Sequence, residues 1–291
     1  MTREIALLVN PTAGKGRGGR LCEPVAERLR AHGCQVDIVI GRDADEAFDQ
    51  ARNRVARGVD ALVAVGGDGL VNMALQMVAG TATPLGIIPA GTGNDVARSL
   101  GLPLDDPAVA VDLLVATEPR AVDAGRAAGR WFGGVLSSGF DSMVNERANR
   151  MTWPPGRSRY NVAILAELRT FRPVPFVLEL DGQRWETEAM LVAVGNGSSY
   201  GGGMQVCPAA DMTDGLFDVT VLGPISKIEF LRVFPQVYSG RHVEHPAVTV
   251  RRAACVSLAA SGVTAYADGE RVALLPVTCD VVPGALQLLA P

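Results

Sequence analysis

The sequence predicts an α/β domain with a parallel sheet, followed by an all-β sandwich domain with a few helices. In the first third of the 291-residue chain, strand patterns alternate with helix patterns, the order of a parallel sheet with helices on both faces. After about Asp123 short strands dominate, and Asp181-Gly182 and Asp268-Gly269 are typical hairpin-turn dipeptides. With no low-complexity linker, we expect abutting domains at residues 1–124 and 125–291, with a cleft between them.

The elements follow from the period of the apolar residues. In the first domain, buried strands are expected at residues 5–9, 36–40, 59–65 and 85–88. Apolar residues three or four apart predict helices around residues 21–29, 47–55, 71–78 and 96–100. In the second domain, strands are expected at 131–137, 176–180, 184–194, 216–222, 248–250 and 255–258, and helices at about 158–172 and 226–238.

Composition argues against several classes of protein. The net charge of −4 argues against a nucleic-acid partner, and no apolar run is long enough to cross a bilayer. The five cysteines show no Cys-x-x-Cys spacing, and no signal peptide precedes the first strand. We therefore expect reduced thiols and a cytoplasmic protein.

Three glycine-rich turns carry the main functional signal. Gly66-Gly67-Asp68-Gly69 and Gly91-Thr92-Gly93-Asn94-Asp95 each join a strand to a helix, and a first cluster surrounds Gly14. Such turns present helix N-terminal N–H groups to phosphates, and they meet at one edge of a parallel sheet. A phosphate tolerates the Asp68 carboxylate only across a cation, which predicts a nucleotide held with Mg²⁺. The alternative is a plain connection with Asp68 as N-cap.

Two patterns in the second half carry weaker signals. Residues 197–201 match a nucleophile elbow, but glycines follow where a helix is required, so the match is interpreted as chance. Residues 211–218 contain closely spaced carboxylates without the full EF-hand pattern. From spacing alone, this segment is more typical of a solvated turn than of a metal site.

Together these motifs resemble the diacylglycerol kinase catalytic-domain family, which includes soluble bacterial diacylglycerol kinases and sphingosine kinases. The resemblance extends in order over nearly the whole chain. It implies an N-terminal nucleotide domain like that of NAD kinases and phosphofructokinases, a C-terminal β-sandwich, and an active site between them. The matching segments are 10–15, 66–69 with Asn72, 88–95, 122–125, 207–211, 214–217 and 267–270.

The resemblance also implies a role for individual residues. ATP would be bound by Asn10, Pro11, Gly14, Gly41, Gly66, Gly67, Asp68, Gly69, Asn72 and Thr92. Asp68, Asp95 and Asp123 would form an acidic network around the nucleotide Mg²⁺. A second, structural Mg²⁺ would be held by Asp214 and by the carbonyls of Asp211 and Leu216. Glu270 would be the base that accepts the proton of the lipid hydroxyl.

The implied activity is that of an ATP-dependent lipid kinase that converts diacylglycerol, or a related lipid alcohol, to phosphatidic acid. Such a protein would act peripherally at the inner face of the membrane, as a monomer or a homodimer. One alternative is an NAD kinase, which shares the Gly-Gly-Asp-Gly turn. Another is a catalytically silent lipid- or nucleotide-binding regulator, supported only by Leu70, where the family usually has threonine.

Residues 147–172 are the expected membrane contact. They contain six arginines against one acidic residue, Glu167, together with Trp153, Tyr160 and Phe171. Basic and aromatic side chains favour an anionic membrane interface. The alternative is a helix whose aromatic residues pack on the sandwich and whose arginines are merely solvated.

Overall fold

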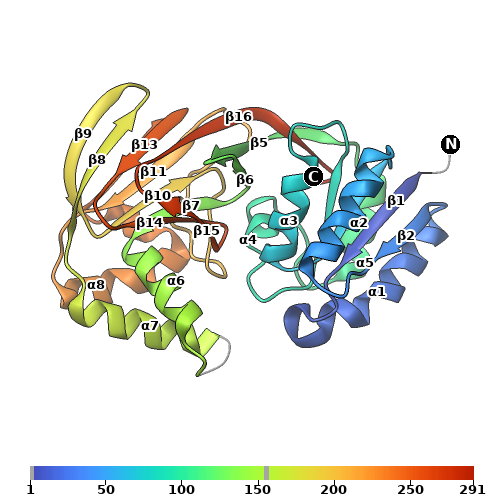
Figure 1. The fold of residues 1–291 in the computed structure, drawn as a ribbon, viewed down its shortest axis with the longest axis horizontal. Helices are drawn as coiled ribbons and strands as arrows, with labels where there is room; N and C mark the ends of the chain where they lie inside the picture. Colours follow the sequence, from blue (N-terminus) through green and yellow to red (C-terminus); the bar gives the residue numbers. More distant parts are fainter. Residues whose placement is uncertain (1–2, 154–156) are drawn as a thin grey trace.

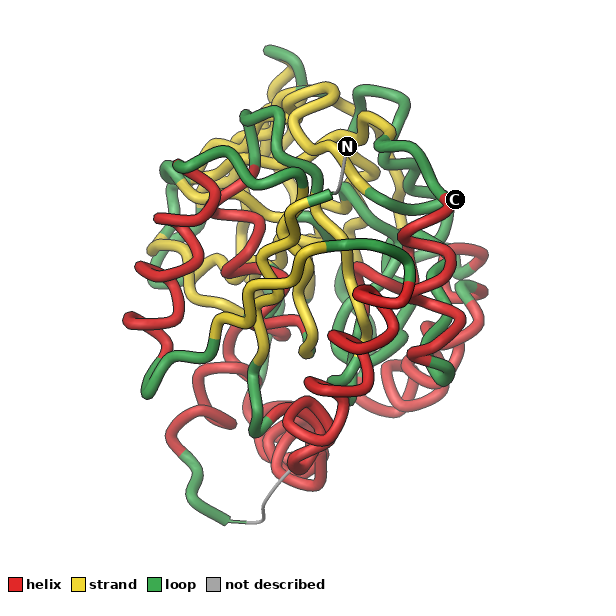
Figure 2. The backbone as a smooth tube through the Cα atoms, turned by 90° about the vertical axis from the view of Figure 1, so that its right-hand side faces the viewer, coloured by secondary structure: helices red, strands yellow, loops and turns green. Residues whose placement is uncertain are grey.

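A computed structural model describes residues 3–153 and 157–291, without the side chains of residues 157–161. The first half is an α/β domain, as the sequence predicts (Figure 1). Its parallel strands lie in the order β2-β1-β3-β4, and helices lie on both sides of the strands (Figure 2). The strands are β1 (Glu4–Val9), β2 (Gln35–Val39), β3 (Ala61–Gly66) and β4 (Leu85–Pro89). The helices are α1 (Ala13–Ala31), α2 (Ala44–Ala56), α3 (Asp68–Val78), α4 (Asp95–Ser99) and α5 (Pro107–Ala116).

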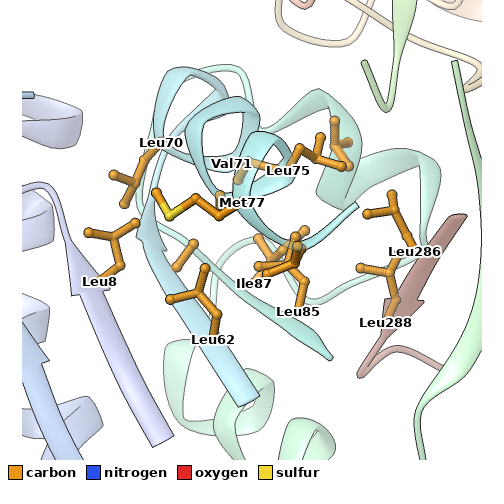
Figure 3. Packing of buried hydrophobic residues seen from close by; sticks show 14 of the residues in the cluster. Leu8, Leu62, Leu70, Val71, Leu75, Met77, Leu85, Ile87, Leu286 and Leu288 are labelled. Carbon is orange, nitrogen blue, oxygen red and sulfur yellow. The ribbon is translucent and has the colours of Figure 1, made fainter. Parts of the chain in front are cut away.

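Alternating strand residues build two cores, one on each face of this sheet. Leu8 and Leu62 pack on one face with α2 and α3 (Figure 3), and Leu7 and Val63 pack on the other with α1 and α5. Burial on both faces explains why these strands are apolar throughout. Leu286 and Leu288, near the end of the chain, complete the first core (Figure 3).

The second half is a β-sandwich joined to the first half by one long strand, β16 (Val277–Leu288). β16 pairs with β13 and β5 and reaches β4 at Leu288, so one sheet runs through both halves. The division at residue 124 stays a prediction. Alongside β16, this layer contains β5 (Arg120–Ala127), β6 (Arg130–Phe132), β8 (Val174–Leu180), β9 (Gln183–Ala189) and β13 (Cys255–Ala259). The facing antiparallel sheet contains β7 (Val135–Gly139), β10 (Leu191–Gly195), β11 (Phe217–Leu222), β12 (Val248–Ala253), β14 (Thr264–Ala267) and β15 (Glu270–Leu274).

Two strands expected to be continuous are each divided. Residues 131–137 form β6 and β7, separated at Gly133-Gly134, and residues 184–194 form β9 and β10, which belong to different sheets. The chain changes sheets around Met190, whose N–H bonds to the carbonyl of Leu222. The alternation of apolar and polar residues cannot show that a chain passes from one sheet to the other, because residues that face the core do so in both sheets.

A helical layer covers the outer face of the second sheet (Figure 1). It consists of α6 (Phe140–Arg150), α7 (Arg157–Thr170), α8 (Lys227–Val233) and the 3₁₀ turn η1 (Phe234–Ser239), with η2 (Arg241–Glu244) beyond it. The sequence predicts α7 and missed α6; the second expected helix ends in the 3₁₀ turn that contains Pro235. Among the described residues, no helix is both long and apolar enough to span a bilayer.

Candidate active site between the two halves

The three glycine turns meet at the carboxyl edge of the parallel sheet, as the sequence predicts. A Cβ atom added to Gly91 would lie 2.4 Å from the Gly67 Cα, so the second and third turns touch through their backbones. A Cβ on Gly14 would lie 2.2 Å from the Ala90 carbonyl oxygen. Side chains are excluded at these contacts, which leaves backbone surface at the sheet edge where a phosphate would bind.

Asp68 connects two of these turns. Its carboxylate accepts hydrogen bonds from the backbone N–H groups of Asn94, at 2.9 Å, and Asp95, at 2.6 Å. It makes no capping bond to its own helix, α3. The simple N-cap interpretation of Asp68 is therefore wrong, since the carboxylate holds the start of α4.

Asp95 links the first half to the second. Its carboxylate accepts hydrogen bonds from the N–H groups of Gly202, at 2.8 Å, and Gly203, at 2.7 Å. Gly201, Gly202 and Gly203 have φ values of 61°, 86° and 102°, a conformation that favours glycine. Burial raises the pKa of Asp95, and the charge of Asp68 raises it further. The glycines that argued against a nucleophile elbow thus form a carboxylate-binding turn.

Asp268 is one of two cleft carboxylates that the sequence analysis did not single out. It lies in the β14–β15 hairpin and accepts N–H bonds from Gly133 and Gly134, both at 2.9 Å, and from Val135, at 3.2 Å. Asn72 of α3 donates its side-chain amide to the same carboxylate at 3.3 Å. Burial raises the pKa of Asp268 to about 6, with Asp68 contributing in the same direction. The Asp-Gly dipeptide signalled the hairpin, but its pairing with Gly133-Gly134 depends on the tertiary fold.

Carboxylates from both halves line one cleft of about 330 Å³. Asp68, Thr92 and Asp95 come from the first half, and Asp141 and Asp268 come from the second. Burial, and to a lesser extent the charge of Asp68, raises the pKa of Asp95 and Asp268. Such a cleft fits a nucleotide with its Mg²⁺, because a divalent cation would offset both effects. Mg²⁺ keeps several waters and binds through one or two carboxylates plus phosphates. This requires no preformed cage, and the described residues contain no cluster of three or more His, Cys, Asp or Glu placed as metal ligands.

An apolar chamber of about 70 Å³ adjoins the cleft under the helical layer. Phe140, Leu191 and Phe230 are among its walls, and Val144, Ile164 and Phe234 line both the chamber and the cleft. A carboxylate-lined cleft and a hydrocarbon-lined chamber therefore share a wall.

Asp141, which the sequence analysis did not single out, lies in this shared wall together with Tyr200. Its carboxylate accepts hydrogen bonds from the Ser137 hydroxyl, at 2.6 Å, and the Asn145 amide, at 3.2 Å, and also interacts with the Tyr200 hydroxyl. Burial raises the pKa of Asp141 and of Tyr200. Asp141 lies in the first turn of α6, a helix that the hydrophobic periodicity did not predict. The sequence therefore gave no reason to place this side chain in the cleft.

Other predicted residues lie away from the cleft wall. Asp123, on β5, accepts hydrogen bonds from the N–H groups of Gly215 and Gly284, both at 2.8 Å, and does not line the cleft. The structure therefore does not bring it together with Asp68 and Asp95, and Asp268 is the further carboxylate near Asp68. Glu270 is exposed at the start of β15, just beyond Gly269 of the cleft wall. Its role as the base stays a prediction.

The remaining nucleotide-binding predictions are also untested. Asn10 accepts hydrogen bonds from the N–H group of Thr12, at 3.0 Å, and from its hydroxyl, at 2.9 Å, which fixes the turn after β1. Pro11 lies in that turn, and Gly41 lies between β2 and α2. Leu70 is 6% exposed and packs in the first core (Figure 3). The residue that departs from the family pattern therefore belongs to the core.

The expected second Mg²⁺ site is closed by protein contacts. One Asp214 oxygen accepts the Leu216 N–H at 3.0 Å, and the other pairs with the Arg252 guanidinium. Asp211 accepts hydrogen bonds from the N–H group and the hydroxyl of Thr213. In this arrangement a guanidinium supplies the positive charge expected from a metal, so these residues do not fit a bound ion unless Arg252 moves.

Comparisons with known proteins agree with the geometry. Residues 4–127 match the model of the diacylglycerol kinase catalytic domain, and residues 134–290 match the YegS C-terminal NAD kinase beta sandwich-like domain. A diacylglycerol kinase of Mycobacterium tuberculosis is 45% identical over 99% of this chain and 95% of its own length. One from Bacillus subtilis is 27% identical over 93% and 90%.

Solved structures share the fold. A diacylglycerol kinase from Bacillus anthracis, 23% identical, superposes with a TM-score of 0.76 over 99% of this chain and 97% of its own. An NAD kinase from Archaeoglobus fulgidus in complex with ATP, 14% identical, gives a TM-score of 0.55 over 99% and 93%. Both family models and the full-length relative point the same way: the chain belongs to the diacylglycerol kinase family.

Proposed function

We propose that this protein transfers the γ-phosphoryl group of ATP to the hydroxyl of diacylglycerol, giving phosphatidic acid and ADP, at the inner surface of the cytoplasmic membrane. The observation that carries the proposal is the shared wall between a carboxylate-lined cleft and an apolar chamber. Phosphoryl transfer needs a site for a charged nucleotide, and a glyceride needs an apolar surface next to that site. The names of the relatives favour the same substrate.

The first half would bind the nucleotide. Backbone N–H groups at the glycine turns would contact the phosphates, with Asn10, Gly14, Asn72 and Thr92 around them. Asp68, Asp95 and Asp268 would hold the nucleotide Mg²⁺, which neutralises charge on the transferred group. In this proposal the Asp95–Gly202 and Asp268–Asn72 hydrogen bonds keep the two walls of the cleft in register.

The second half would position the acceptor. The glyceride hydroxyl would lie near Asp141 and Tyr200, and the start of an acyl chain would enter the apolar chamber. Glu270 would accept the hydroxyl proton as the oxygen attacks the γ-phosphorus and the bond to ADP breaks. Glu270 is exposed at the start of β15, beside the cleft residue Gly269, so its carboxylate is open to an acceptor that enters from the membrane side.

The alternatives receive less support. An NAD kinase has no evident use for an apolar chamber beside the nucleotide, and the likeness to the Archaeoglobus enzyme concerns the fold. A silent regulator was suggested only by Leu70, and the burial of that side chain in the first core favours a role in packing.

A transfer assay tests the proposal. Protein, Mg²⁺ and ATP labelled at the γ position are incubated with diacylglycerol in mixed micelles, with NAD, or without an acceptor. We expect labelled phosphatidic acid only with diacylglycerol. Labelled NADP would favour the NAD kinase alternative, and no transfer together with nucleotide binding would favour the regulator.

A further inference from the structure

The helical layer has a packed inner face. Phe140 of α6 makes edge-on ring contacts with Phe171 and Phe230, at centroid distances of 5.2 and 4.9 Å. Phe171 is therefore core, which corrects its expected place at the membrane interface. Of the other residues expected there, Trp153 is 77% exposed, and the side chains of Arg157, Arg159 and Tyr160 lie outside the described residues.

The outer face of the layer is unusually apolar. Val162 and Leu165 are three residues apart on α7, and Ile228 and Leu231 are three apart on α8, so each helix presents an apolar stripe. Leu165 and Ile228 are 62% and 66% exposed. Of the eleven large exposed hydrophobic residues in the described parts of the chain, six belong to this layer and Trp153 follows α6 directly. The six are Met143, Val162, Leu165, Ile228, Leu231 and Tyr238. Single exposed apolar residues are normal, but such a concentration marks an interaction surface.

The segments that form the helical layer also carry an excess of positive charge, which favours an anionic partner. Residues 140–172 and 226–245 contain nine arginine or lysine residues and five acidic residues, in a chain with a net charge of −4. The acidic groups face inward or are paired: Glu167 is buried against Arg147, and Glu229 lies 3.3 Å from His245. Arg169, Arg172 and Arg232 are exposed. Apolar side chains among positive charges complement an anionic lipid surface.

The layer also borders the cleft. Ile164 lines the cleft from α7, beside the outward Leu165, and Tyr238 of η1 lines the cleft while remaining 53% exposed. The chamber has room for about five water-sized groups, too few for the two acyl chains of a membrane glyceride. Most of the hydrocarbon therefore lies outside the chamber.

We propose that the outward face of α6, α7, α8 and η1 docks on an anionic phospholipid bilayer, so that a lipid rises into the cleft with most of its hydrocarbon still in the membrane. The identity of that lipid rests on the function proposed above; the docking does not. The contact is reversible, since the apolar side chains come from two short stripes and the remaining attraction is electrostatic.

Vesicle sedimentation of the full chain tests the docking without catalysis. We expect wild type to bind phosphatidylcholine vesicles that contain phosphatidylglycerol, to bind phosphatidylcholine alone weakly, and to be released by high salt. The triple variant Leu165→Ser, Ile228→Ser, Leu231→Ser should lose at least about tenfold in binding. The matched control Ile40→Ser, Val109→Ser removes exposed apolar residues of the first half and should bind as wild type does.

A charge variant and a soluble substrate complete the test. Arg169→Gln, Arg172→Gln, Arg232→Gln should weaken binding about a hundredfold at low salt. Both triple variants should phosphorylate a monomeric short-chain diacylglycerol at the wild-type rate, which shows that they are folded. Docking is overturned if wild type ignores phosphatidylglycerol or if the apolar variant binds like its control. If wild type binds vesicles but phosphorylates no lipid, the proposed function fails and the docking stands.

Discussion

The two walls of the cleft are built in different ways. On the nucleotide wall, Asp68 and Asp95 lie in short turns where glycine, strand end and helix start are adjacent in sequence. On the lipid wall, Asp141, Tyr200 and Asp268 come from three segments that meet only through the antiparallel sheet. A local turn can be identified from a few neighbouring residues. A wall assembled from distant strands depends on the register of every strand between them.

The two walls also differ electrostatically. Backbone N–H groups compensate Asp68 and Asp95 on the nucleotide wall. On the lipid wall backbone N–H groups also compensate Asp268, but Asp141 is held by side chains in largely apolar surroundings, and burial raises its pKa. We therefore expect substitutions on the first wall to affect the transfer itself, and those around Asp141 to affect the choice and orientation of the acceptor.

The largest effect is expected at Glu270. Removal of a general base costs roughly 10²–10⁴-fold, so Glu270→Gln should reduce kcat by that factor while the KM for ATP stays within about twofold. Steady-state transfer to diacylglycerol measures both constants. Glu188→Gln, an exposed glutamate on β9, is the control and should match wild type. An unchanged kcat in Glu270→Gln would mean that another group accepts the proton of the lipid hydroxyl.

Asp268 should make folding stability depend on pH. Its pKa is raised from 3.8 to about 6 in the folded protein, so between these values the folded state binds more protons than the unfolded state. The free energy of unfolding should therefore fall as pH rises from 4 to 6, by about 2 kcal/mol from this group over that interval. Urea denaturation of wild type and Asp268→Asn across this range measures the difference.

Asp181 offers a matched control for this measurement. It occupies the same kind of Asp-Gly hairpin, with φ of 48° against 50° for Asp268, but it is exposed. Asp181→Asn is the reference for the same substitution in the same kind of hairpin, and the pH dependence of Asp268→Asn is compared with that of Asp181→Asn. If Asp268→Asn leaves the pH dependence unchanged, folding does not raise the pKa of Asp268.

A substitution of Leu70 can show whether this position contributes to packing of the core or to nucleotide binding. Leu70→Thr places a hydroxyl in the first core and removes methyl groups, so we expect a loss of about 2 kcal/mol of stability. The KM for ATP should not improve, because the side chain points into the core. Leu75→Thr, at another buried position of α3, should show the same pattern. A lower KM in Leu70→Thr alone would mean that position 70 reaches the nucleotide.

Much of the first half was predictable for a physical reason. Strands buried on both faces are apolar throughout, and each glycine turn lies next to the strand that presents it. The sequence therefore predicts the parallel sheet and the convergence of the three glycine turns at one edge, where the structure brings Gly67 against Gly91. The features that the sequence did not predict depend on contacts between distant segments. Asp123 accepts hydrogen bonds from Gly215 and Gly284 and does not join Asp68. The hydrogen bond between Asp268 and Gly133 spans 135 residues. Helix α6 was missed because its polar residues, including Asp141, face the cleft.

Asp141 should affect the lipid more than the nucleotide. Asp141→Asn keeps the shape of the side chain but exchanges charge-assisted hydrogen bonds for neutral ones, which costs about 1.4 kcal/mol or tenfold. We expect that factor in the KM for diacylglycerol and no change in the KM for ATP. Equal effects on both constants would mean that Asp141 maintains the whole cleft and does not position the acceptor.

The smallest expected effect concerns the loop that contains Asp214, where a guanidinium and a metal ion compete for one carboxylate. Arg252 pairs with Asp214 and lies 3.2 Å from the buried Asp218. Arg252→Met should lower Tm by about 2–4 °C in EDTA, since both carboxylates lose their cation. Mg²⁺ should restore part of this loss, because a ligand that binds only the folded state stabilises it. In wild type the same Mg²⁺ should shift Tm less, since Arg252 already occupies the carboxylate.

If Mg²⁺ shifts Tm in neither protein, the loop that contains Asp214 is an ordinary turn closed by an ion pair. If it shifts wild type as much as Arg252→Met, the ion displaces Arg252 and the implied structural Mg²⁺ site exists.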